Sequence, residues 1–390
     1  MTSTRRFSPC SRTPRSPAAA LALTLTALAF GFGCARDASV TRAPAGVVHT
    51  QANALGVNYE AFARLGYQLA WRGRAIMGKG GRVLFFDAVD GGVLVQSTVH
   101  TITMMENATG SNRWSTTLGA PLDRFVGQTD ANGSILIASD NELFILDRRT
   151  GEITDKQNLA LVVSTPPVVA GPIAVFGSGS GEVLGHNLQT GFKLWGYQLH
   201  GSIQAPPVAV GALVGVVSQR GDVIIIDPST GSATLRGRIF DGLANHPIAS
   251  DDTLFIASLD QSVYAFPDSG SSWRWRVRTE HPIAAQPALL GGVLYLDIPG
   301  QGLAAIDPAT GARRWTNPDA HGDAVGARRG DVIVFSHEDH AAFRIDADTG
   351  DIIERADLPG VERMLMRPAG NGDLYTATAG GAIGRYVPQS

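Results

Sequence analysis

The sequence predicts an all-β fold, an eight-bladed β-propeller of four-stranded blades, and three observations lead to this prediction. Glycine makes up 46 of the 390 residues, which is roughly 12% where about 7% is usual, and the excess indicates many tight turns. A turn motif and a separate proline series both recur about every forty residues. Hydrophobic residues reach 44% of the chain, so it can bury a large core.

The turn motif begins with Asp or Asn, usually ends in Thr-Gly, and occurs seven times. Its glycines are Gly110, Gly151, Gly191, Gly231, Gly270, Gly311 and Gly350. The prolines of the second series are Pro167, Pro207, Pro247 and Pro287. We expect the acid or amide to cap its own turn and the glycine to adopt a positive φ, so the motif predicts a hairpin turn and not a ligand site.

Each period contains four short strands separated by polar turns. In the period that begins at Pro207, residues 208–217 form two apolar segments, residues 223–227 form a third, and the stretch after Gly231 forms the fourth. Such units cannot bury both faces alone, which favours radial packing as propeller blades. The tryptophans that follow a motif glycine by four residues are Trp114, Trp195 and Trp315. Their fixed phase predicts that they pack between blades.

The number of repeats and the positions of the two ends predict how the ring closes. Seven motifs lie between Asn107 and Gly350, and an eighth unit begins near Val361 but stops where its own motif would stand. We expect residues 67–71 to supply the missing outer strand of that last unit. Pairing of the N-terminal and C-terminal strands would then remove the exposed sheet edges. The propeller is expected to span residues 64–390.

The first 33 residues carry the features of an export signal. Four arginines precede an uncharged, mostly apolar stretch at residues 17–33, and Cys34 follows directly. The alternative is a transmembrane anchor, but about 17 residues are short for a membrane span and Thr24 and Thr26 interrupt them. We therefore expect residues 1–33 to be a removed signal peptide and residues 34–63 to be a lipidated polar spacer.

Cys34 is the expected site of lipidation. A cysteine after a small residue at the end of an apolar segment resembles the lipobox of bacterial lipoproteins, although Gly31 and Phe32 depart from its usual pattern. The resemblance implies that the Cys34 thiol is acylated and anchors the protein to a membrane. Ala35 follows the cysteine, and in proteobacterial sorting this residue permits transfer to the outer membrane. We expect a lipid-anchored outer-membrane protein that faces the periplasm.

Charge and cysteine usage exclude several classes of function. Lysine and arginine number 32 against 35 acidic residues, and loss of the leader's four arginines changes the net charge from −3 to −7. Such a chain lacks the clustered cations that bind phosphate backbones, which argues against a nucleic-acid partner. The only other cysteine is Cys10, in the leader. No disulfide, thiolate metal site or catalytic thiol is therefore expected in the mature fold.

The pattern Pro-Val-x-x-x-Gly-x-Val-x-Val…Gly-x-Leu-x-x-x-Asp-x-x-Thr-Gly-x-x-x-Trp, as in residues 165–195 and 286–315, resembles the PQQ-like propeller repeat. This repeat is specific for a fold and not for an activity. A lipoprotein signal, a short spacer and a single ring of the repeat resemble the BamB family of outer-membrane β-barrel assembly lipoproteins. The resemblance implies a non-catalytic, monomeric scaffold that binds the barrel-inserting subunit, with no cofactor and no metal.

Candidate binding residues lie in turns at one end of the ring. Arg220, Gln261, Gln301 and Asp339 occupy equivalent positions in successive repeats, and loops on a rigid scaffold are frequent recognition elements. The alternative is a quinone- or other ligand-binding propeller, a divergent quinoprotein enzyme or a sensor, that uses the central channel. Quinoprotein dehydrogenases require an adjacent cysteine pair, which the sequence lacks. We expect the turn from His337 to His340 to face water and not to hold a metal.

Overall fold

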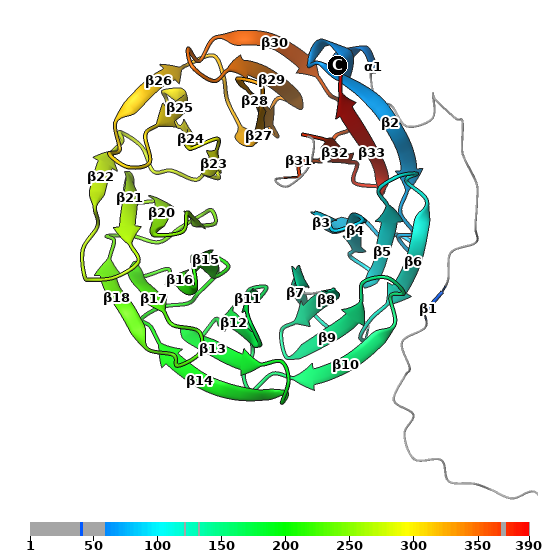
Figure 1. The fold of residues 1–390 in the computed structure, drawn as a ribbon, viewed down its shortest axis with the longest axis vertical. Coiled ribbons are helices and arrows are strands. Elements are labelled where there is room, and N and C mark those ends of the chain that lie inside the picture. The colour runs from blue at the N-terminus through cyan, green and yellow to red at the C-terminus, as the bar shows by residue number, and fades with distance from the viewer. Residues whose placement is uncertain (1–39, 42–58, 121, 132, 368–371, 390) are drawn as a thin grey trace, which may run out of the picture. The chain divides into compact units, whose positions relative to one another are not determined.

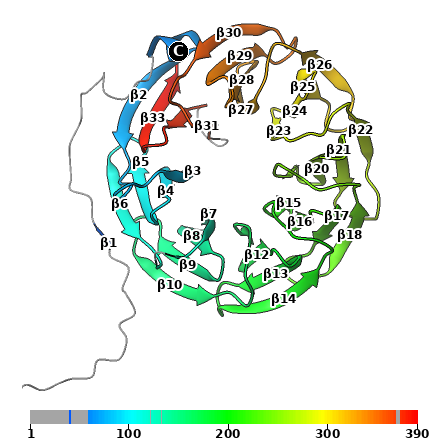
Figure 2. The ribbon, with the colours of Figure 1, turned by 180° about the vertical axis from the view of Figure 1, so that it is seen from behind.

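The computed structural model describes residues 40–41, 59–120, 122–131, 133–367 and 372–389. Eight antiparallel sheets stand side by side around a central axis (Figure 1). Their first strands lie near the axis and their fourth strands form the rim, as Figure 2 shows from the other side. The predicted eight-bladed propeller of four-stranded blades is confirmed. None of the helices in these residues is long and apolar enough to cross a membrane.

Strands follow one another from the axis to the rim in chain order. The blades are blade 1, β3 (Val83–Val89), β4 (Gly92–Ser97), β5 (Thr101–Glu106) and β6 (Asn112–Thr117); blade 2, β7 (Phe125–Ala131), β8 (Ser134–Ser139), β9 (Glu142–Asp147) and β10 (Ile153–Asn158); blade 3, β11 (Val168–Ala170), β12 (Ile173–Gly177), β13 (Glu182–Asn187) and β14 (Phe192–Gln198); blade 4, β15 (Val208–Val210), β16 (Leu213–Val217), β17 (Asp222–Ile226) and β18 (Ala233–Arg238). The second half of the ring contains blade 5, β19 (Ile248–Ala249), β20 (Thr253–Ser258), β21 (Ser262–Pro267) and β22 (Trp275–Arg278); blade 6, β23 (Ala288–Leu290), β24 (Val293–Ile298), β25 (Gly302–Ile306) and β26 (Arg313–Asn317); and blade 7, β27 (Asp323–Arg328), β28 (Asp331–Ser336), β29 (Ala341–Asp346) and β30 (Ile352–Asp357).

Blade 8 joins the two ends of the folded chain. It contains β31 (Arg363–Met366), β32 (Leu374–Ala377) and β33 (Ala382–Pro388), and its outer strand is the N-terminal β2 (Tyr67–Arg74). β2 and β33 pair antiparallel along their whole length. The predicted closure of the ring by its terminal strands is therefore confirmed.

Two short elements precede β2 in the stretch expected to be a polar spacer. β1 (Val40–Thr41) pairs with β6 as a fifth strand at the outer edge of blade 1. Helix α1 (Tyr59–Arg64) buries Ala61 and Phe62 completely or almost completely. A short amphipathic helix thus covers the closing blade just before residue 64, where the propeller is expected to begin.

The repeated motif forms a hairpin turn between the third and fourth strands. In blade 2, the Asp147 carboxylate accepts hydrogen bonds from the backbone N–H groups of Arg149 (2.9 Å) and Thr150 (2.8 Å). These bonds, that of Thr150 above all, hold the pKa of Asp147 below its ordinary value. Gly151 ends the turn with a φ of 74°. The predicted roles of the acid and the glycine are confirmed.

The tryptophans connect neighbouring blades, as predicted. In five of them the indole Nε1 donates to a carbonyl oxygen in the motif turn of the next blade: Trp71 to Asn107, Trp114 to Arg148, Trp195 to Pro228, Trp275 to Pro308 and Trp315 to Ala347, at 2.6–2.9 Å. In four blades the strand register skips the residue just before the tryptophan, which is Ala70, Arg113, Leu194 or Arg314. Such a bulge re-aims the following side chain, here toward the next blade.

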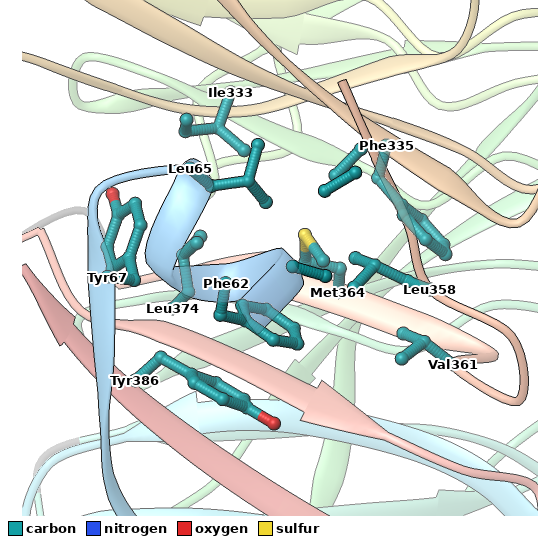
Figure 3. Packing of buried hydrophobic residues seen from close by; sticks show 13 residues of the cluster. Phe62, Leu65, Tyr67, Ile333, Phe335, Leu358, Val361, Met364, Leu374 and Tyr386 are labelled. Atoms are coloured by element: carbon teal, nitrogen blue, oxygen red, sulfur yellow. The ribbon is translucent and has the colours of Figure 1, made fainter. Parts of the chain in front are cut away.

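The hydrophobic core is divided into layers between adjacent blades. One layer combines Val223 and Ile225 of blade 4 with Tyr264 and Phe266 of blade 5. The layer at the ring closure contains Phe62 of α1, which stacks on Tyr386 with ring centroids 3.6 Å apart and planes 11° apart (Figure 3). The helix therefore fills the space where the first and last parts of the chain meet.

Candidate partner-binding surface

Two sets of loops lie at the same end of the ring. Because the strands of a blade alternate in direction, the turn between the second and third strands lies at the same end as the connection from the fourth strand to the next blade. The connections are residues 75–82, 118–124 (residue 121 excepted), 159–167, 199–207, 239–247, 279–287, 318–322 and 358–362. We call this end, with both sets of loops, the connection face.

All four predicted partner-binding residues lie on the connection face. Arg220 follows β16, Gln261 follows β20, Gln301 follows β24 and Asp339 follows β28, so each lies in the turn between second and third strands of blades 4 to 7. In the residues that the structure describes, no hydrogen bond or ion pair joins any two of them. They lie along one arc of the connection face and do not form a single cluster.

The four side chains differ in the contacts that they already form within the protein. Arg220 is exposed, and its stem lies over Gly201, where a Cβ would be 2.7 Å from its Cγ. Gln301 accepts a hydrogen bond from Arg313 (2.5 Å), and Asp339 accepts one from the Ser336 hydroxyl (3.1 Å).

Gln261 has a φ of 64°, a left-handed conformation that is uncommon outside glycine. Of the four residues, Arg220 has the most freedom to bind a partner.

Sequence reasoning missed the apolar part of this face. Leu122 is 97% exposed, Phe240 72% and Val162 65%, and each lies in a connection between blades. Large apolar residues within loops rich in Asp, Gly and Ser were the available signal. Exposed large apolar residues can mark interaction sites.

Phe240 is held in place from two sides. Its backbone N–H donates to the Asp260 carboxylate (2.9 Å), which also accepts a hydrogen bond from the Tyr264 hydroxyl (2.6 Å). The Arg276 guanidinium lies over the Phe240 ring, 4.9 Å from its centroid. Aromatic residues and arginine are both enriched in protein interfaces.

Histidines are concentrated on the connection face. Those found there are His100, His200, His246, His281, His321, His337 and His340. His200 lies 2.9 Å from the Asp222 carboxylate and His337 lies 3.7 Å from that of Asp323. Burial raises the pKa of Asp323. The connection face thus brings imidazole rings close to carboxylates.

The inner strands carry a charged network at the opposite end. The Asp90 carboxylate pairs with Arg367 of blade 8, and Arg148 lies 3.0 Å from Asp130 and 3.6 Å from Asp90. The acids here are matched by arginines, whereas a calcium site needs carboxylates free to bind the ion. Among the described residues, no group of three or more His, Cys, Asp or Glu side chains is placed to hold a metal.

Comparison with known proteins identifies one matching family model and distant curated relatives of the same family. Residues 60–271 and 244–364 match the family model described as outer membrane protein assembly factor BamB. The chain is similar to the outer membrane protein assembly factors BamB of Bordetella pertussis (27% identity over 154 residues, 38% of this chain and 40% of the relative) and Burkholderia pseudomallei (25% over 169 residues, 40% and 42%). The matched part thus spans about two fifths of the length of these curated relatives.

Solved structures agree on the fold. The crystal structure of BamB from Moraxella catarrhalis superposes with a TM-score of 0.66 at 19% identity, covering 82% of this chain and 97% of that one. The computationally designed Ika8 protein superposes with a TM-score of 0.68 at 11% identity, covering 82% and 99%. At these identities the likeness concerns the fold alone. Because the family model matches more than half of the chain, the protein belongs to the family of outer membrane protein assembly factor BamB.

Proposed function

We propose that this protein is a non-catalytic interaction platform that binds the barrel-inserting subunit of the outer-membrane assembly machinery through its connection face. Membership of the BamB family supports this role. The observation that carries the proposal is Phe240, an exposed aromatic residue fixed by Asp260 and flanked by Arg276. A rigid residue binds with little loss of conformational entropy, which favours its use in recognition.

The remaining features of the face support a protein partner. Leu122 and Val162 are further exposed apolar residues in connections of the same face, and Arg220 is an exposed charge in a turn of that face. An apolar centre with a polar rim is the usual composition of a specific protein interface.

We further propose that Cys34 carries the lipid anchor and that the ring faces the periplasm from the outer membrane. Cys34 lies outside the described residues, and the proposal rests on its sequence context and on the family. Attachment to one membrane leaflet would raise the frequency of encounter with a membrane-bound partner without new contacts.

Affinity purification tests the proposed partner. The full-length protein with a C-terminal tag is expressed in its native membrane, the outer membrane is solubilised in mild detergent, and the captured proteins are identified by mass spectrometry. We expect the barrel-inserting subunit among them at near-stoichiometric amounts. If that subunit is recovered no better than from a strain with an unrelated tagged lipoprotein, the proposed partner is wrong.

A further inference from the structure

A cavity of about 360 Å³ lies at the ring closure, at the end opposite the connection face. Its volume falls at the lower end of the range of small-molecule sites, roughly 300–1,000 Å³. Leu65, which directly follows α1, and Ile333 of β28 form an apolar side, and Tyr67 lies beside them (Figure 3). The cavity therefore joins the first turn of the folded chain to blade 7.

Three arginines line the same cavity. Arg328 is the last residue of β27, Arg329 lies in the turn between β27 and β28, and Arg344 comes from β29. Arg344 donates to the Asp331 carboxylate at 2.6 Å. Neither Arg328 nor Arg329 forms an ion pair with any residue that the structure describes, so the lining has an excess of two positive charges.

Nearby acidic groups do not neutralise this excess. The Asp373 carboxylate, which adjoins this region, pairs with Arg385 at 2.6 Å. Burial raises the pKa of Tyr67 to about 12, so its phenol is neutral at pH 7. The cavity is thus a half-enclosed region of positive potential beside an apolar wall.

The backbone at Arg329 is a second, independent observation. Arg329 and Gly330 form a two-residue hairpin loop, and both have a positive φ, 50° and 85°. Such loops favour Asn, Asp or Gly at the first position, and the corresponding residues of other blades are Asp90, Gly171, Gly211, Asp251 and Gly291. An arginine in this strained conformation is unfavourable for folding, which points to a use for its charge.

We propose that this cavity binds a phosphate monoester. The dianionic phosphate would lie among the guanidinium groups of Arg328, Arg329 and Arg344, because guanidinium forks match phosphate oxygens and the excess charge equals that of the ligand. Its organic group would lie against Leu65 and Ile333. The ligand is either a soluble phosphomonoester or a lipid with a terminal phosphate.

Isothermal titration calorimetry with phenyl phosphate, at constant ionic strength and pH 7.5, tests the site in the purified full chain. We expect saturable binding of one molecule and at least tenfold weaker binding by Arg328→Gln. Arg329→Asn should also bind at least tenfold more weakly while folding as well as the unmodified protein, since asparagine suits the left-handed position. Arg278→Gln, an exposed arginine of β22, is the matched control and should bind normally.

Two results would overturn the proposal: no saturable binding by the unmodified protein, or equal affinity in Arg329→Asn. Vesicles that contain phosphatidic acid then distinguish the sources. If these vesicles compete with phenyl phosphate for the protein, the ligand is a lipid. If they do not compete, the ligand is a soluble phosphomonoester. Because the cavity and the connection face lie at opposite ends, failure here leaves the proposed partner binding untouched.

Discussion

Gly151 lies directly beneath the indole ring of Trp114 from the neighbouring blade, so close that a Cβ on Gly151 would be 2.4 Å from Trp114 Cδ2. The same arrangement recurs where Gly231 faces Trp195 and where Gly350 faces Trp315. In each case the glycine satisfies two demands at once, a positive φ and room for the ring. The repeated glycine is therefore part of the contact between blades as well as part of a turn.

Gly151→Ala should destabilise the protein more than Gly191→Ala does. The two glycines have nearly equal φ values, 74° and 72°, so both alanines carry a left-handed penalty of roughly 1–2 kcal/mol. Gly191 faces only Gln157, whose nearest atoms would be 3.6 Å from a Cβ at residue 191. Alanine at 151 must also displace Trp114, at an additional cost of about 1–3 kcal/mol. Urea unfolding measures the free energy of unfolding of both variants. Equal decreases would contradict the argument that the contact with Trp114 adds to the cost.

The repeats could be predicted from the sequence, because each motif lies within one short segment. The contacts between blades and the candidate binding surface could not be predicted, because they depend on segments that are far apart in the sequence. The forty-residue period alone predicts the turn glycines, the tryptophans and the number of blades. In blade 2, however, Asp155 occupies the tryptophan position, and Gln157, two residues further along, donates to the Leu188 carbonyl at 2.8 Å. That substitute contact, like the meeting of Leu65 with Ile333 at the closure, requires knowledge of which strands become neighbours.

Phe62→Ala should weaken the ring closure specifically. Phe62 is 1% exposed and stacks on Tyr386 of β33, and removal of a buried phenylalanine side chain costs about 3–5 kcal/mol. Phe192→Ala is the control, because Phe192 is 73% exposed on the outer strand β14, where a substitution changes stability by about 0.5 kcal/mol or less. Chemical denaturation of both variants gives the two costs. Similar values would show that α1 contributes little to closure.

Phe240→Ala should weaken capture of the barrel-inserting subunit at least tenfold. Phe240 is 72% exposed on the connection face, so its loss should leave the fold intact and remove the proposed anchor. Phe192→Ala again serves as control, since Phe192 has nearly the same exposure but lies on the rim. Quantitative affinity purification compares them. Equal recovery of the subunit by both variants would place the interface elsewhere on the ring.

Arg220→Ala tests the predicted partner-binding turns through the association rate and its dependence on salt. An exposed charge at the rim acts mainly on the association rate, so we expect slower association and a weaker dependence on salt, with little change in dissociation. Surface plasmon resonance at two salt concentrations measures both rates. An unchanged salt dependence would remove Arg220 from the proposed surface.

Cys34→Ala should abolish lipid attachment. If the thiol is acylated, the variant either keeps its leader or is cleaved elsewhere and released as a protein that fractionates without detergent. Intact-mass measurement of the mature N-terminus is the direct readout, and the unmodified protein should carry added acyl chains. An unmodified Cys34 in protein extracted by salt alone would rule out the proposed anchor.

His186 should make the folded state less stable as the pH falls. Its side chain is fully buried in β13, Nε2 donates to the Gln157 side-chain oxygen at 2.7 Å, and Nδ1 is buried without a hydrogen-bond partner in the described residues. Burial lowers the pKa of His186 below its ordinary value. Protonation at Nδ1 would place an unpaired charge in the core.

The unfolded chain therefore binds the proton more readily than the folded protein does. The free energy of unfolding should be fully maintained above about pH 6.5, the pKa of an unperturbed histidine, and should decrease below it by up to about 1.4 kcal/mol per pH unit until the folded pKa is reached. Urea unfolding at pH 7.5 and 5.5 measures the difference. His186→Gln should reduce that difference, whereas His281→Gln, at an exposed position on the connection face, should retain it. If His186→Gln keeps the full pH dependence, the buried imidazole is not its source.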